Sequence, residues 1–159
     1  MEIDGRAIRR SAELYGSPAI ATRRRQLPMP KVLVVEDSNV LQMYYKQIFA
    51  KLAGYQVTFT KNGRQALDHI ENNGMPDVVV LDINMPVMDG LEFLGHFRGD
   101  RKTPPARVII VTTEGREDDY KRGLDAGASA YLKKPFTPEA LIELLQGLLA
   151  KPIRAGAIT

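Results

Sequence analysis

Apolar positions from residue 31 onward fall into two alternating patterns. Short, nearly continuous apolar runs recur along the chain, and such runs are typical of strands buried on both faces of a sheet. Between these runs, apolar residues return every three or four positions, which is the spacing of one helical face. The pattern predicts five strands, at 31–35, 56–60, 77–81, 107–111 and 129–132.

Five helices are predicted to follow these strands. Ser38 is a favourable N-cap for the first helix, and Gly54 is predicted to end it. Further helices are predicted at 62–73, around 91–97, at 115–126 and in a last segment that ends near Ala150. The residues predicted to face the core are Leu41, Tyr44, Tyr45, Ile48, Leu52, Ala66, Leu67, Ile70, Leu91, Leu94, Phe97, Leu141, Leu144, Leu145 and Leu148.

Strands that alternate with helices predict one architecture. Five such pairs favour an α/β fold, a doubly wound five-stranded parallel sheet with five helices in a single domain. Right-handed crossovers leave only a few strand orders. In these folds ligands bind beyond the carboxyl ends of the strands, where the strand order reverses.

Composition narrows the possible functions. The chain has 159 residues and 44% hydrophobic residues, which suits one soluble domain with its own core. It has no cysteine, which excludes disulfides, thiolate metal sites and cysteine nucleophiles. Its strongly apolar runs reach four residues, whereas a membrane-spanning helix needs about 20. We therefore expect a cytoplasmic protein without a membrane partner.

Charge divides the chain into a head and a body. Residues 1–30 hold six arginines and three acids, whereas residues 31–159 hold 16 basic and 16 acidic residues. The body is neutral and gives no support to nucleic-acid binding. We expect residues 1–30 to be a mobile basic extension, the alternative being an arm that binds a partner or an acidic surface. Residues 31–150 would form the domain, and 151–159 a short tail.

Polar groups collect at the ends of four predicted strands. Three acids within one small site cannot all stay ionised without compensation, and oxygen ligands without Cys or His select ions such as Mg²⁺. A carboxylate beside such an ion can act as a nucleophile toward a phosphoryl group, while a lysine and a hydroxyl neutralise its oxygens. In chain order, the groups are Glu36 and Asp37, Asp82, Thr112 and Thr113, and Lys133 and Lys134.

Four motifs together give the chain a family resemblance. They are VVEDS at 34–38, DINMPVMDG at 82–90, VTTEG at 111–115 and YLKKPF at 131–136. In combination they resemble the receiver domain of response regulators in two-component signalling, over about residues 31–150. The resemblance implies the flavodoxin-like receiver fold and a switch controlled by phosphorylation.

The resemblance also implies a role for each matching residue. Asp82 would be the phosphoacceptor, with Thr112 and Lys134 contacting the phosphoryl group and a cis bond between Lys134 and Pro135. Tyr131 would be the aromatic switch residue. The expected Mg²⁺ ligands are Glu36, Asp37, Asp82 and the backbone carbonyl of Asn84.

Two positions tune phosphate loss in the family, and here they are Asn84 and Glu114. This pair is similar to that of chemotaxis-type, CheY-like receivers. Glu36 departs from the commoner Asp at this position of the family, and its longer side chain is expected to shift the water network of the metal. Asp89 precedes Gly90 in a turn signal and is predicted to cap a helix rather than to bind metal.

The implied function is that of a stand-alone response regulator, since nothing resembling an output domain follows. A histidine kinase would donate the phosphoryl group, and the face formed by the fourth helix, fifth strand and fifth helix would bind a protein target, in chemotaxis or motility. The domain would be a monomer or a weak, phosphorylation-dependent dimer, and not an enzyme in its own right. The alternatives are a phosphorelay shuttle or phosphate sink, and a Mg²⁺-dependent aspartyl phosphatase.

Overall fold

Five parallel strands form a single sheet, as the sequence predicts, and their order is β2-β1-β3-β4-β5. The computed structural model describes residues 28–99, 106–113 and 117–151. The prediction of a doubly wound α/β fold is confirmed. The strands are β1 (Lys31–Val35), β2 (Gln56–Thr60), β3 (Val78–Leu81), β4 (Arg107–Thr112) and β5 (Ala130–Lys133).

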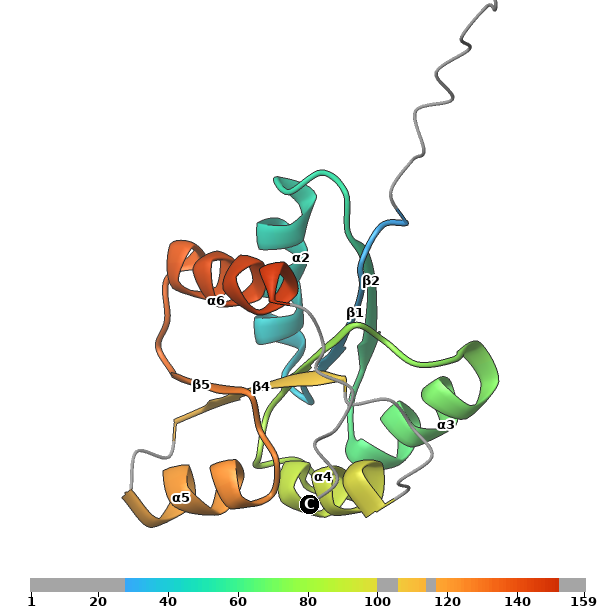
Figure 1. The fold of residues 1–159 in the computed structure, drawn as a ribbon, viewed down its shortest axis with the longest axis vertical. Helices are drawn as coiled ribbons and strands as arrows, with labels where there is room; N and C mark the ends of the chain where they lie inside the picture. Colours follow the sequence, from blue (N-terminus) through green and yellow to red (C-terminus); the bar gives the residue numbers. More distant parts are fainter. Residues whose placement is uncertain (1–27, 100–105, 114–116, 152–159) are drawn as a thin grey trace, which may run out of the picture.

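Five helices cover the two faces of the sheet, α2 and α6 on one face and α3, α4 and α5 on the other (Figure 1). None of the helices in the described ranges has the length and apolarity that crossing a membrane requires. The helices are α2 (Asn39–Ala50), α3 (Gly63–Asn73), α4 (Gly90–Gly99), α5 (Glu117–Asp125) and α6 (Pro138–Ala150).

Two hydrophobic cores separate the helices from the sheet. Alternate residues of each central strand point into opposite cores, so Val34 packs with α2 and α6 while Leu33 packs with α3 and α4. All four residues of β3 are buried, as the continuous apolar run predicts. On the far face, α5 packs closely, because a Cβ on Gly123 would lie 2.7 Å from Ile110 Cδ1.

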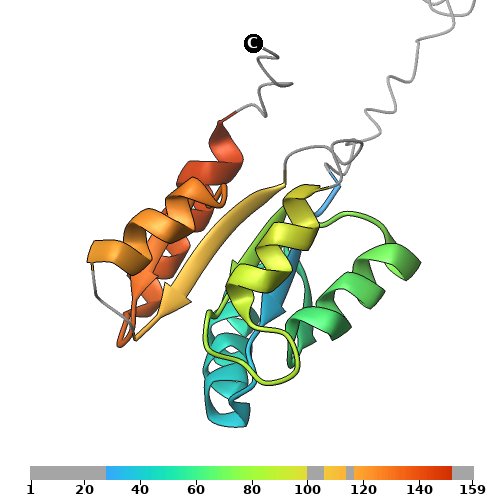
Figure 2. The ribbon, with the colours of Figure 1, turned by 90° about the horizontal axis from the view of Figure 1, so that it is seen from below.

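The strand order reverses beside β1, which lies between β2 and β3. The chain passes from β1 to β2 on one side and then returns to β3 on the other, so the loops after β1 and β3 diverge to opposite faces. The arrowheads of β1 and β4 point to the same edge of the sheet (Figure 2). The ends of β1 and β3 therefore border the site at which this class of fold binds ligands.

The two ends of the described body lie at the opposite, amino edge of the sheet. The carbonyl of Pro30, just before β1, accepts a hydrogen bond from the backbone N–H of Gln56. Lys151 follows α6, and its carbonyl accepts a hydrogen bond from the side chain of Arg107, the first residue of β4. The chain thus enters and leaves the described body far from the reversal point.

The first helix differs from its prediction at its C-terminal end. It ends at Ala50 with Lys51 as C-cap, not at Gly54. Gly54 has φ 95°, a conformation suited to glycine, and it lies in the turn that leads to β2. The prediction of Gly54 as the helix end was therefore wrong by one turn, because a left-handed glycine marks the turn and not the last helical residue.

A strained turn lies between β3 and α4. Val87 has φ 71°, and the backbone N–H of Met88 donates to the carbonyl of Pro86 at 2.8 Å. This is the rare form of the γ-turn, which is costly for a β-branched residue. The side chain of Val87 is 82% exposed, so packing does not compensate for the strain.

Replacing Val87 by glycine should raise the free energy of unfolding by about 1 kcal/mol, since relief of strain outweighs the added entropy of the unfolded chain. Val87→Ala keeps the Cβ atom and should give a smaller gain. Urea unfolding of the three proteins measures both effects. A loss of stability in Val87→Gly would contradict this account of the turn.

Candidate functional site

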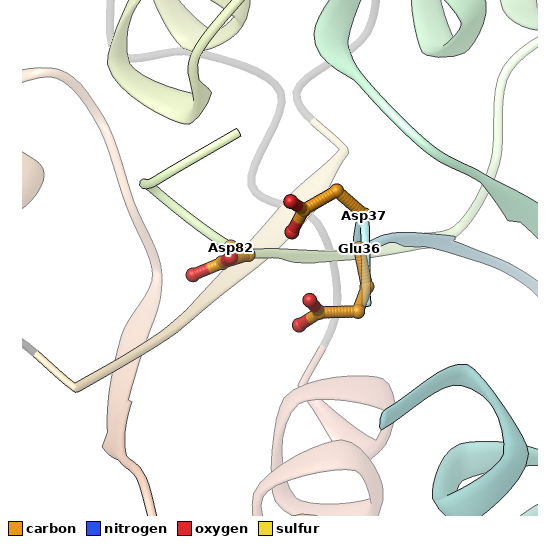
Figure 3. A group of neighbouring side chains, drawn as sticks. All are labelled: Glu36, Asp37 and Asp82. Atoms are coloured by element: carbon orange, nitrogen blue, oxygen red, sulfur yellow. The ribbon is translucent and has the colours of Figure 1, made fainter. Parts of the chain in front are cut away.

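Three carboxylates meet at the reversal point. β1 and β3 pair in parallel with Val35 opposite Leu81, so the residues that follow, Glu36 and Asp82, leave the sheet side by side. Carboxylate oxygens of Glu36, Asp37 and Asp82 all lie within 4.8 Å of one another. Figure 3 shows the three carboxyl groups turned to the same side of the strand ends. The sequence-predicted acidic cluster is thus one compact group.

Lys134 brings a positive charge to this cluster. Its Nζ atom lies 2.8 Å from Glu36 Oε2 and 3.4 Å from Asp82 Oδ1. The side chains of Lys134, Glu36 and Asp82 are only 10%, 2% and 7% exposed, so these charges interact with little screening by water. The backbone N–H of Lys134 donates to the carbonyl of Thr112, and the Lys134–Pro135 bond is cis, as predicted.

An aromatic cluster holds the loop that follows Lys134. The hydroxyl of Tyr44 donates to the carbonyl of Phe136 at 3.1 Å, and the two rings lie 5.6 Å apart. The ring of Tyr45, the next residue of α2, also lies 5.5 Å from the ring of Phe136. Burial raises the pKa of Tyr45, so it stays a neutral packing residue. Helix α2 therefore fixes the chain on which Lys134 is carried.

Gln42 is a functional-site residue that the sequence reasoning missed. Its buried amide donates to the carbonyls of Glu36 at 2.8 Å and Thr60 at 3.3 Å. The N–H of Glu36 also donates to the carbonyl of Thr60. These bonds join the ends of β1 and β2 and fix the backbone that presents Glu36. The signal was a polar residue three positions before Tyr45 and seven before Phe49, on the buried face of the helix.

Gly90 supports the backbone of Asp82 from the other side. A Cβ at Gly90 would lie 2.2 Å from the carbonyl oxygen of Asp82, closer than any real contact. The N–H of Gly90 donates to the carbonyl of Ile83 at 2.8 Å. Asp89 Oδ1 accepts from the N–H of Glu92, which confirms its predicted role as the cap of α4.

Burial of the cluster changes the acidity of its members. Desolvation raises the pKa of Asp82, and Lys134 opposes that rise. Desolvation likewise raises the pKa of Glu36, against the hydrogen bonds from Lys134 and the backbone N–H of Ser38. A further cation beside these two carboxylates would therefore stabilise their charged forms.

The remaining predicted residues lie around this cluster or outside the described ranges. Thr112 is fully buried at the end of β4, one strand away from Asp82. Tyr131 on β5 is half-buried, and its ring lies edge-on to Tyr120 of α5 at 5.2 Å. Asn84 is exposed in the loop after Asp82. Glu114 lies outside the described residues.

The donor set fits a hard divalent cation. Carboxylate oxygens from Glu36, Asp37 and Asp82 are the ligands that Mg²⁺ prefers, and they carry three negative charges against the single ammonium of Lys134. Asp37 is exposed, so the cluster is open to water on that side. A cation held there would keep part of its water shell, as Mg²⁺ does.

Comparison with known proteins places this site in a family. Residues 32–146 match the response regulator receiver domain, so the chain belongs to that family, whose members are signalling proteins rather than classical enzymes. The match includes the whole acidic cluster and every strand except the first residue of β1, Lys31. The resemblance drawn from the four motifs is confirmed.

The relatives include chemotaxis proteins. The chemotaxis protein CheY homolog of Campylobacter jejuni is 35% identical over 127 residues, which are 80% of this chain and 98% of that protein. The structure of Vibrio cholerae chemotaxis protein CheY4 has a TM-score of 0.69 and 35% identity, over 76% of this chain and 98% of the other. Response regulator MprA of a Mycobacterium species is 36% identical, but only 51% of it is matched.

Gly90→Ala should destabilise the protein by about 1–3 kcal/mol, because the new methyl group would displace the backbone of Asp82. Gly95 is the matched control in the same helix, since a Cβ there meets nothing within 4 Å. Gly95→Ala should instead stabilise by up to about 1 kcal/mol through helix propensity. Chemical unfolding of both variants measures the contrast, and equal effects would contradict the proposed contact.

Without metal, the stability of the protein should depend on pH through Asp82 and Glu36. Their raised pKa values mean that the folded state binds protons more tightly than the unfolded state, so their contribution to stability falls as pH rises above about 4. Asp82→Asn removes one buried charge and should raise the unfolding midpoint at pH 7.

That gain should shrink as pH is lowered from 7 toward the ordinary aspartate pKa of about 4, because the raised pKa of Asp82 makes the wild-type carboxyl take up its proton at a higher pH than an exposed aspartate does. Thermal unfolding in EDTA across this range measures it. Asp118→Asn removes an exposed charge and serves as the control. An Asp82→Asn effect that is the same at every pH would contradict burial as the cause of the shift.

Proposed function

We propose that Asp82 is the phosphoacceptor of a response regulator, and that the chain takes a phosphoryl group from a histidine kinase in the presence of Mg²⁺. The single observation that supports this most directly is Lys134 Nζ, which lies between buried Glu36 and Asp82 within contact distance of both. The ammonium group beside Asp82 supplies positive charge that offsets part of the negative charge of an incoming phosphoryl group.

The chemistry follows from the positions of these groups. An oxygen of Asp82 attacks phosphorus, the bond from phosphorus to the donor's histidine nitrogen breaks, and that nitrogen keeps the electron pair. The metal, held by Glu36, Asp37, Asp82 and the Asn84 carbonyl, would neutralise charge on the phosphoryl oxygens. Lys134 and the Thr112 hydroxyl pair with the remaining oxygens.

The response would then pass from β4 to β5 and to α5, which packs beside β5. Thr112 ends β4 and Tyr131 lies on the adjacent strand β5, where its ring contacts Tyr120 of α5. We propose that Thr112 moves toward the phosphoryl group and that Tyr131 turns into the space behind it. Such a two-state change is typically worth 1–3 kcal/mol, which alters the affinity of a target for the α5–β5–α6 face by about 5–150-fold.

The pathway is proposed from the relatives. CheY proteins of two bacterial genera match over nearly their whole length, which favours a cytoplasmic receiver that acts on a separate protein target in chemotaxis. The exposed side chains of Tyr120 and Leu124 on α5 provide an apolar surface for such a target. Glu114, at the position that tunes phosphate loss, and Asn84 would set the lifetime of the signal.

Asp82→Asn should abolish phosphate incorporation, since the amide cannot act as the nucleophile. Radiolabelled acetyl phosphate with Mg²⁺ is the donor, so that no kinase need be known. Asp68→Asn removes an exposed carboxylate of α3 and should leave incorporation at the wild-type level. EDTA should suppress labelling of the wild type. Wild-type labelling of Asp82→Asn would refute the assignment.

A further inference from the structure

The loop after β5 carries Lys134 between two backbone anchor points. On one side, the N–H of Lys134 donates to the carbonyl of Thr112 at 2.9 Å, which ties the lysine to the end of β4. On the other side, the hydroxyl of Tyr44 donates to the carbonyl of Phe136 at 3.1 Å, which ties the loop to α2. Residues 134–136 are thus held by two elements that are far apart in the sequence.

The hydroxyl of Tyr44 does something that the neighbouring rings cannot do. The ring of Phe136 lies 5.6 Å from that of Tyr44 and 5.5 Å from that of Tyr45, so the aromatic packing would persist without the hydroxyl. Aromatic pairs are favourable over centroid distances of about 4.5–7 Å, whereas a hydrogen bond requires its own distance and direction. The hydroxyl therefore fixes the backbone two residues beyond Lys134.

We propose that Tyr44 is a positioning residue for phosphoryl transfer, because its hydroxyl holds the loop so that the ammonium group of Lys134 stays beside Asp82. This inference rests on the proposed function, in which Asp82 accepts the phosphoryl group and Lys134 pairs with its oxygens. Nζ of Lys134 lies 3.4 Å from Asp82 Oδ1. Misplacement of such a group by about 1 Å can slow a reaction by up to about 100-fold.

The expected metal ligands depend on other supports. Glu36 and Asp82 leave the ends of β1 and β3, and their backbones are supported by Gln42 and by the close approach of Gly90. The hydroxyl of Tyr44 bonds instead to the loop after β5. Its loss should therefore slow phosphoryl transfer while Mg²⁺ affinity stays within about twofold of the wild type.

A groove beside the hydrogen bond should keep the loss of stability small. A cavity of about 190 Å³ lies between α2 and α6, and its lining includes Tyr44, Ile48, Pro138 and Ile142. Water that enters this groove can satisfy the carbonyl of Phe136 when the hydroxyl is removed. Tyr44→Phe should therefore fold, and it tests the position of the loop rather than the stability of the domain.

A double-mutant cycle on the rate of phosphate incorporation tests the proposal. Radiolabelled acetyl phosphate with saturating Mg²⁺ is reacted with the wild type, Tyr44→Phe, Lys134→Met and the double variant. Tyr44→Phe should lower the rate about three- to tenfold, as expected for the loss of one hydrogen bond that acts on the transition state. In the Lys134→Met background the same change should alter the rate less than about 1.5-fold, because Tyr44 acts through the lysine.

Tyr55→Phe is the matched control, since it removes the same hydroxyl group from a tyrosine just before β2, at the amino edge of the sheet. It should leave the rate and the Mg²⁺ affinity, measured by isothermal titration with MgCl₂, at the wild-type level. An unchanged rate in Tyr44→Phe, or an equal slowing in both backgrounds, would overturn the proposal. A wild type that takes no label would instead overturn the proposed function.

A measurement with Lys134 intact keeps the test valid if Lys134→Met is labelled too slowly or does not fold. Hydrogen exchange at the backbone amide of Lys134, which bonds to Thr112, is compared between the wild type and Tyr44→Phe. It should become at least about threefold faster in the variant, whereas the amide of Val34 in β1 should keep its rate. Slower labelling with unchanged exchange at Lys134 would show that Tyr44 acts by another route, and would overturn the proposal.

Discussion

A buried ammonium group among carboxylates is the interaction on which the site depends. Removal of one partner from a buried ion pair typically costs about 3–5 kcal/mol, because a charge is left without compensation. Here one lysine faces two buried acids, with a third acid at the rim. Negative charge therefore remains in excess, and a further positive charge would stabilise the site.

The surrounding fold keeps this excess charge in place with neutral groups. Gln42 and the N–H of Glu36 join the ends of β1 and β2, while Gly90 lets α4 approach the backbone of Asp82. Tyr44 holds the carbonyl of Phe136, just after Lys134. All of these contacts act on the backbone, which leaves the charged side chains as the groups that can rearrange when the balance of charge changes.

Much of this arrangement could be predicted from the sequence, because the spacing of apolar residues and the alternation of strands and helices can be read along the chain. Continuous apolar runs located the strands, and the acids that follow two of them indicated the site. The end of the first helix was misplaced, since Gly54 belongs to a turn whose geometry depends on where β2 begins. Gln42 was missed because its role depends on hydrogen bonds to two carbonyls, those of Glu36 and of Thr60, which are brought together only by the fold.

The preference of Lys134 for Glu36 over Asp82 was also beyond the sequence. Residue order placed a lysine near several acids, and family resemblance assigned it to the phosphoryl group. How closely Lys134 contacts each acid is a matter of 2.8 against 3.4 Å, and a difference of less than 1 Å cannot be read from the order of residues.

The position of the two ends of the described body has a practical consequence. Pro30 and Lys151 lie at the amino edge of the sheet, whereas the acids lie beyond its carboxyl edge. A fluorescent reporter or an affinity tag joined directly to Pro30 or Lys151 would begin at the edge opposite the acids, where it leaves the approach of a large phosphodonor unobstructed. The same geometry lets such domains be combined with different modules during evolution without any redesign of their chemistry.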